Sequence, residues 1–170
     1  MSNERVRPLR AEATGSLAES TIRSVLTSRG YATCPVQREP PDDAGHAQTA
    51  MFGTPLHPVA PTRTVTAQYP IGKGIYGLPI FADFFLAGAP HFPTGLAIEV
   101  KWQQSPGSVD EKFPYLVHCI QECYPCPTVI IADGGGQRPG AMAWLRGQCQ
   151  GKLLAVYTLA EFLGWANRHL

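Results

Sequence analysis

A short apolar run in the last third of the chain constrains its fold more than any other segment. Residues 127–133 read Pro-Thr-Val-Ile-Ile-Ala-Asp, with four consecutive apolar side chains at the centre. Such runs are typical of strands that are buried on both faces, which happens when helices cover both sides of a sheet. We therefore expect an α/β protein in which helices flank a central sheet.

Sequences of the capping-box type mark the starts of three helices. Each has Ser or Thr followed three residues later by Glu, at Ser16, Ser108 and Thr158, and each precedes apolar residues at helical spacing. Gly30 is a natural helix end, and Pro114 must kink the second helix or delay its start. The predicted helices lie at about 17–29, 109–123, 141–146 and 159–166.

The remaining apolar or alternating segments predict strands, because connections rich in glycine and proline separate them. With the helices they give the order αβββαβαβα, a mixed sheet with helices on both faces. The 170 residues suit a single domain over 1–170. A loop at about 34–62, which holds six prolines, interrupts it. The predicted strands are 63–71, 78–86, 96–103, 127–133 and 153–157.

The predicted strand at 96–103 carries the side chains best suited to catalysis. Alternation along a strand puts Glu99, Lys101 and Gln103 on one face, opposite three apolar residues. Hydrolysis of a phosphodiester needs an anion that holds Mg²⁺ and a cation that holds the attacking water and the phosphate. A strand with one solvated face has the same pattern, so the interpretation requires a second carboxylate.

A second carboxylate lies sixteen residues upstream. Asp83 is the only charge between Leu78 and Leu86, and a carboxylate in apolar surroundings is costly unless it is paired or binds a metal. The turn-rich connection at 87–95 predicts antiparallel strands that can place Asp83 beside Glu99 and Lys101. An incidental ion pair between Asp83 and Lys101 in an ordinary hairpin is the alternative.

The order of Asp83 followed by a strand with Glu99-Val100-Lys101 resembles the PD-(D/E)xK nuclease superfamily. Ala82 stands where the motif usually has proline. The segment 107–116 resembles the one that follows the motif in some site-specific members, and the element order fits from about Ser16 onward. The resemblance implies a restriction-endonuclease-like core and a metal-dependent DNA endonuclease of the site-specific, restriction-like kind.

The resemblance also implies roles for individual residues. Asp83 and Glu99, with the Val100 carbonyl, would hold one or two Mg²⁺ ions, for which Mn²⁺ can substitute, and Lys101 would orient or help deprotonate the water. Gln103 could bind a phosphate or steady Lys101, or could simply face solvent. The implied partner is double-stranded DNA, cut by a homodimer on both strands.

Other residues are weaker candidates for the site. Members of the family often place a helical glutamate near the metal, and Glu19 is the candidate, although its spacing from Ser16 favours a role at the helix start. Ser108, Lys112 and Lys73 are candidate DNA contacts.

Competing functions have less support. A DNA-binding or assembly subunit without catalysis would share the fold, and a recombination or repair nuclease would share the site. The cysteines after His118 lack the paired Cys-x₂-Cys spacing of zinc sites. Neither Gly72-Lys73-Gly74 nor the triple glycine at 134–136 matches a nucleotide-binding loop, and no serine- or cysteine-hydrolase motif occurs.

Net charge and the length of the apolar stretches indicate the cellular environment that we expect. The net charge of +1 does not by itself indicate a nucleic-acid-binding protein. No apolar stretch approaches the ~18–20 residues that span a bilayer, and no secretory apolar region follows Met1. We expect a cytoplasmic protein without membrane association, whose five cysteines are free thiols.

Overall fold

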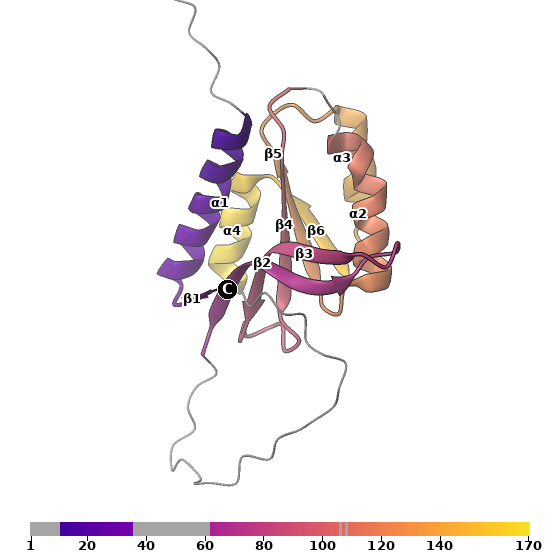
Figure 1. The fold of residues 1–170 in the computed structure, drawn as a ribbon. Coiled ribbons are helices and arrows are strands. Elements are labelled where there is room, and N and C mark those ends of the chain that lie inside the picture. The colour runs from indigo at the N-terminus through magenta and orange to yellow at the C-terminus, as the bar shows by residue number, and fades with distance from the viewer. Residues whose placement is uncertain (1–10, 36–61, 106, 108) are drawn as a thin grey trace, which may run out of the picture.

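A six-stranded mixed sheet lies between two pairs of helices in the structure, a computed structural model (Figure 1). It describes residues 11–35, 62–105, 107 and 109–170. The strands are β1 (Ala32–Cys34), β2 (Thr64–Lys73), β3 (Pro79–Ala87), β4 (Leu96–Trp102), β5 (Thr128–Asp133) and β6 (Leu153–Tyr157). The helices are α1 (Ala11–Ser28), α2 (Val109–Cys123), α3 (Pro139–Gly147) and α4 (Leu159–His169).

The strands lie side by side in the order in which they follow along the chain. β2 is antiparallel to β3, and β3 to β4, whereas the pairs β1–β2, β4–β5 and β5–β6 are parallel. The crossovers from β4 to β5 and from β5 to β6 run through α2 and α3, which cover one face, while α1 and α4 cover the other (Figure 1). The predicted α/β class and mixed sheet are thereby confirmed.

β5 forms the centre of the core, as its apolar run predicts. Val129 and Ile131 pack with residues of α1 and α4, whereas Ile130 and Ala132 pack with residues of α2 and α3. All four side chains are at most 1% exposed. Because burying one large aliphatic side chain contributes about 1.5–3 kcal/mol, this strand holds the two helical layers against the sheet.

Two features differ from the sequence-based prediction. α1 is already helical at Ala11, so Ser16 lies inside the helix and the capping box predicted at Ser16 is wrong. The short strand β1 was not predicted, because three residues are too few to show a period. The predicted bounds of α2 are confirmed, and of the two effects expected of Pro114 the delayed start does not occur. At α4 the predicted capping box of Thr158 and Glu161 is confirmed.

The β2 strand of the long hairpin changes the face that it presents. Val65 and Ala67 pack with the α1/α4 layer, whereas Tyr69 and Ile71 pack with the α2/α3 layer. Side chains two apart in a regular strand share a face, so the strand turns over at Gln68. The φ angle of Gln68 is 50°, in the left-handed region, and among the described residues no other non-glycine has a positive φ.

β3 turns over at the matching position. Ala82 packs with the α2/α3 layer and Phe84 with the α1/α4 layer, so the reversal falls at Asp83. Pairing between β3 and β4 covers only Phe84–Leu86 opposite Leu96–Ile98, with nothing paired beyond it on the Asp83 side. The outer half of the hairpin therefore leaves the sheet and crosses to α2 (Figure 1).

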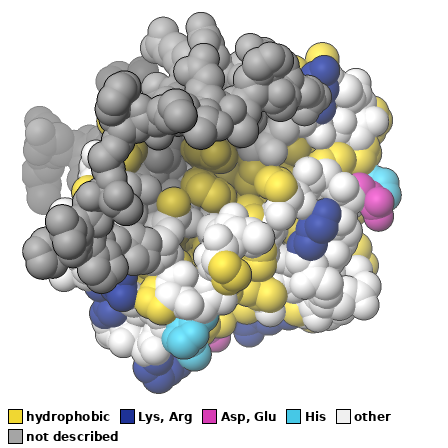
Figure 2. Space-filling model, turned by 90° about the horizontal axis from the view of Figure 1, so that it is seen from below, with side chains coloured by type: hydrophobic (Ala, Val, Ile, Leu, Met, Phe, Trp, Pro, Cys, Tyr) yellow, Lys and Arg dark blue, Asp and Glu magenta, His cyan; other side chains and the backbone are white. Residues whose placement is uncertain are grey.

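Seen from below, the described side chains are mainly apolar at the centre of the face (Figure 2). Lys and Arg side chains lie separately around this centre. The described residues therefore form no continuous basic patch on the face that Figure 2 shows. No helix in the described parts of the chain combines the length and apolarity needed to cross a bilayer.

Candidate active site

Asp83, Glu99 and Lys101 meet where β3 and β4 separate. Past Phe84 and Ile98 the two strands no longer pair, and the Asp83 carboxylate takes over the role of the missing strand partner. Its Oδ2 accepts a hydrogen bond of 2.7 Å from the backbone N–H of Val100. The predicted proximity of Asp83 to the Glu99-Val100-Lys101 segment is therefore present.

The ammonium of Lys101 lies between the two carboxylates. Its Nζ donates to Glu99 Oε2 at 2.7 Å, to Asp83 Oδ2 at 3.1 Å and to the Val100 carbonyl at 3.4 Å. The Lys101 and Asp83 side chains are 25% and 20% exposed, whereas that of Glu99 is 4% exposed. The site thus opens to solvent at Asp83 and Lys101 and ends in the buried Glu99.

Burial and charge act against each other in this cluster. Burial raises the pKa of Glu99, and Lys101 opposes that rise while Asp83 adds to it. Burial would by itself lower the pKa of Lys101, but the combined attraction of Glu99 and Asp83 outweighs it, so that this pKa is raised. Lys101 is held as a cation by the carboxylates, and their neutralisation would expose it to the lowering effect of burial.

Tyr124 holds the buried end of the site, and sequence reasoning did not identify it. Its hydroxyl donates a hydrogen bond of 2.6 Å to Glu99 Oε1, the oxygen that Lys101 does not use. Tyr124 is buried, and burial together with the charge of Glu99 raises its pKa, which keeps the hydroxyl protonated as a donor. A tyrosine that follows a helix is an ordinary core residue, so no motif marked it.

Gln68 holds the other carboxylate and was also missed. Its side-chain Nε2 donates to Asp83 Oδ1 at 3.2 Å. The left-handed conformation costs a non-glycine residue about 1–2 kcal/mol, and strain of this kind gathers at functional sites. The turn of β2 at Gln68 places the side-chain amide of Gln68 opposite Asp83. Neither the residue types nor their spacing in the sequence predicts such a turn.

Glu19 lies on the side of α1 that faces the site. Burial raises its pKa, the nearby charge of Asp83 raises it further, and Arg23 and Lys101 oppose the rise. Because the helix extends beyond Ser16 to Ala11, the predicted helix-start role of Glu19 is wrong. Its accessory role at a metal stays a prediction.

Gln103 is placed away from the carboxylates. β4 ends at Trp102, and the buried Gln103 donates through Nε2 to the carbonyl of Gly136 at 3.1 Å. Its predicted contact with Lys101 is not found, and the Lys101 carbonyl instead accepts from Gln137 Nε2 at 3.2 Å. A catalytic role for Gln103 has no support in this geometry, because its amide is used to hold a loop.

The triple glycine after β5 is explained by the same contact. A Cβ at Gly134 would lie 2.5 Å from the Gln103 carbonyl oxygen, and Gly136 donates its N–H to that oxygen at 2.7 Å. Side chains at Gly134 and Gly136 would force apart the connections that follow β4 and β5. The glycines therefore serve a close approach of backbones, in agreement with the interpretation that they form no nucleotide-binding loop.

A pocket of about 320 Å³ opens beside Glu99 and Lys101, between the hairpin and α2. Lys112 also lines the pocket, and its predicted DNA contact stays a prediction. Cys119 also lies in its wall, and all five cysteines are free thiols. Lys73 is exposed near the end of β2, and Ser108 lies outside the described residues, so their predicted DNA contacts stay predictions.

The oxygen atoms around Lys101 fit a divalent cation. Two carboxylates and the Val100 carbonyl converge on the point where the ammonium lies, and hard oxygen donors are the ligands that Mg²⁺ and Mn²⁺ prefer. Among the residues that the structure describes, no group of three or more His, Cys, Asp or Glu side chains could hold a metal ion. Water or substrate oxygens would have to complete the coordination of a bound ion.

Comparison with known proteins agrees with this geometry. A family model described as a PD-(D/E)XK nuclease superfamily domain matches residues 10–170. No curated protein and no solved structure matches the chain significantly. The matched span includes all six strands and four helices, together with Asp83, Glu99 and Lys101. The chain therefore belongs to the PD-(D/E)XK nuclease superfamily.

Proposed function

We propose that this protein is a metal-dependent endonuclease that hydrolyses phosphodiester bonds of double-stranded DNA. The observation that carries the proposal is the convergence of Asp83, Glu99 and the Val100 carbonyl on the ammonium of Lys101. An ion pair with no further role would not need two carboxylates held by four separate donors. A subunit without catalysis is less well supported, because the three catalytic groups of the motif, Asp83, Glu99 and Lys101, are in place.

Asp83, Glu99 and the Val100 carbonyl would bind Mg²⁺, with Mn²⁺ as a substitute. A bound ion of this kind stabilises the charge that develops on the phosphate during hydrolysis, an effect worth several kcal/mol. Gln68 and Tyr124 each hold the carboxylate oxygen that Lys101 does not contact, at Asp83 Oδ1 and Glu99 Oε1. The remaining oxygens, Oδ2 and Oε2, therefore stay aimed at the same point.

Lys101 would orient the attacking water and take up its proton. In the structure the two carboxylates keep Lys101 charged against the effect of burial. A divalent ion bound by those carboxylates would weaken their attraction for the ammonium, so that burial would lower the pKa of Lys101 and favour its role as a base. Nζ would then be free to turn from the carboxylates toward water or phosphate.

The DNA-cutting proposal extends to a site-specific, restriction-like enzyme that acts as a homodimer. Two copies related by a two-fold axis would cut both strands of a palindromic target, since the symmetry of the protein must match that of the site. Lys112 beside the pocket and Lys73 on the hairpin would contact phosphates.

Plasmid cleavage with defined metals tests the proposal. We expect cutting with Mg²⁺ or Mn²⁺ and none with EDTA, because the carboxylates alone leave the phosphate charge unbalanced. Ca²⁺ alone should support DNA binding without cutting, since it prefers looser and higher coordination. Glu122→Gln, which removes an exposed carboxylate of α2, is the matched control and should cut normally. Undiminished cutting in EDTA would contradict the proposed mechanism.

A further inference from the structure

We propose that the substrate carries an unpaired nucleotide beside the scissile phosphate, and that its base lies in the pocket between the β2–β3 hairpin and α2. The inference rests on the proposed nuclease function but replaces its restriction-like form: the substrate is double-stranded DNA with a local interruption of pairing, such as a flap, bulge or single-stranded branch, and not a fully paired palindromic site. It is carried by the lining of the pocket, by the exposed aromatic residues at its mouth and by the position of both next to Lys101.

The pocket has the size and lining that suit one base. Its volume of about 320 Å³ is at the small end of the range for ligand pockets, roughly 300–1,000 Å³, which admits a single nucleoside and excludes a base pair with its backbones. Apolar and aromatic side chains form most of its wall. The side chains that would contact a base are Ile80, Phe81, Tyr115 and Leu116. Lys112 adds a cation to the lining, and Glu99 and Lys101 lie at its catalytic end.

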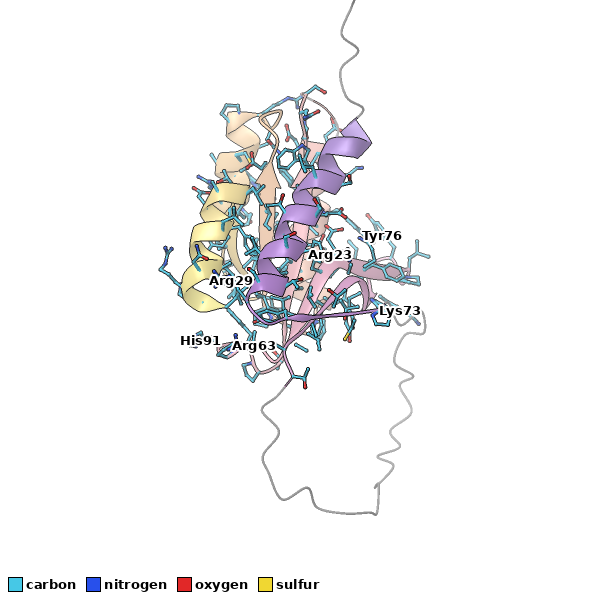
Figure 3. All side chains as sticks on the ribbon, turned by 90° about the vertical axis from the view of Figure 1, so that its left-hand side faces the viewer. Arg23, Arg29, Arg63, Lys73, Tyr76 and His91 are labelled. Atoms are coloured by element: carbon cyan, nitrogen blue, oxygen red, sulfur yellow. The ribbon has the colours of Figure 1, made fainter. Side chains whose placement is uncertain are left out.

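Exposed apolar side chains continue the pocket onto the hairpin. Tyr76, Leu78 and Phe81 are 74%, 66% and 49% exposed. Tyr76 stacks on Tyr115, with ring centroids 5.4 Å apart and planes 23° from parallel. Figure 3 shows Tyr76 and Lys73 on the projecting hairpin, on the side of the view opposite Arg29, Arg63 and His91. The two stacked rings form an aromatic platform on the hairpin, and this platform is exposed to solvent.

The position of the platform favours DNA over a protein partner. Phe81 and Tyr115 line the same pocket as Glu99 and Lys101, so a protein seated there would cover the catalytic groups. A fully paired duplex offers base edges, sugars and phosphates to a protein surface, whereas the face of a base becomes available only when the base leaves the stack. Aromatic rings bind such faces, and Lys112 and Lys101 supply cations for the adjoining phosphates.

Binding in Ca²⁺ to three oligonucleotides of one sequence tests the inference: a full duplex, the duplex with a central single-stranded branch, and the single strand. We expect the wild type to bind the branched form more tightly than the full duplex. Tyr76→Ala should weaken binding to the branched form about fivefold or more, the lower limit for loss of one aromatic–base stack. Affinity for the full duplex should not change. Tyr76→Phe, which keeps the ring, should restore the preference.

Trp144→Ala is the matched control, because Trp144 is an exposed aromatic residue of α3 outside the pocket, and it should change neither affinity. Equal losses on branched and full duplex, or no loss on either, would overturn the inference. So would a change of Tyr76→Ala from dimer to monomer in sedimentation, since the platform would then be a subunit contact. Tyr76 is largely exposed, so thermal melting should show an intact fold. Metal-dependent plasmid cutting is read separately, so the proposed function can stand where this inference fails.

Discussion

The two strands that carry the site differ in regularity, burial and pairing. β4 is parallel to β5 over Ala97–Trp102, and its first four residues are buried. β3 pairs with β4 over three residues, turns over at Asp83 and continues into a hairpin with exposed apolar side chains. Glu99 and Lys101 are thus placed by a regular backbone, whereas Asp83 is placed at an irregularity.

The difference teaches that the two carboxylates are held in different ways. Glu99 is buried in a stiff strand, and it is oriented by hydrogen bonds from Tyr124 to Oε1 and from Lys101 to Oε2. Asp83 lies where pairing has stopped, so Val100 N–H and the strained Gln68 supply the contacts that a neighbouring strand would otherwise give. We expect loss of a supporting contact to have a larger effect at the buried Glu99 than at the partly exposed Asp83.

The largest expected effect tests whether the irregular strand β3 is as important for catalysis as the regular strand β4. Asp83→Ala, Glu99→Ala and Lys101→Ala should each lower the cleavage rate at least about a thousandfold, because metal and cation act together on the phosphate. Groups that act as a unit are not additive, so double variants should be little worse than the worst single variant. Rates are measured on plasmid DNA, with folding checked by circular dichroism.

Binding separates the roles of the three residues. The two carboxylate variants should bind DNA as well as the wild type or better, because negative charge near the phosphate is lost, whereas Lys101→Ala should bind slightly more weakly. If Asp83→Ala alone cut DNA at a near-normal rate, β3 would not be needed for catalysis. Near-normal cutting by Lys101→Ala would remove the basis of the proposed function.

Tyr124→Phe should have the next largest effect, through the buried Glu99. Removing a residue that orients a metal ligand typically costs about 10–100-fold in metal affinity or activity. The Tyr124 hydroxyl also lowers the pKa of Glu99 against the rise caused by burial, so its loss raises that pKa further. Glu99 binds a cation when ionised, and the acidic limb of the pH–rate profile should therefore shift to higher pH. An unchanged limb would show that Tyr124 only fills space.

Gln68 gives the smallest and most specific effect. Gln68→Gly should raise the unfolding free energy by up to about 1 kcal/mol, because glycine adopts the left-handed conformation without strain. It should also weaken Mg²⁺ binding several-fold, because Asp83 Oδ1 loses its amide donor. Gln68→Ala keeps the strain and removes the amide, so it should weaken Mg²⁺ binding without stabilising the fold. Calorimetric titration and thermal melting measure the two quantities, and unchanged Mg²⁺ binding in both variants would limit Gln68 to turning the strand.

Most of the fold could be predicted because its signals are local. The double-sided burial of β5, the bounds of α2 and the capping box at Thr158 each follow from a few adjacent residues. The capping box at Ser16 failed because the same residue pattern also fits the interior of a helix that begins earlier. The partner of Gln103 could not be predicted, because its amide donates to the Gly136 carbonyl, which lies 33 residues further along the chain.

The sequence by itself determined the α/β class, the order of most elements and the motif of Asp83, Glu99 and Lys101, because periodicity and residue chemistry can be evaluated along the chain. Only the tertiary structure decided which residues support that motif. Tyr124 reaches Glu99 because α2 returns the chain to the buried end of β4, and Gln68 faces Asp83 because the hairpin turns over as it crosses from one helical layer to the other. Both contacts join distant parts of the chain, and a left-handed glutamine is stable only where the surrounding packing imposes it.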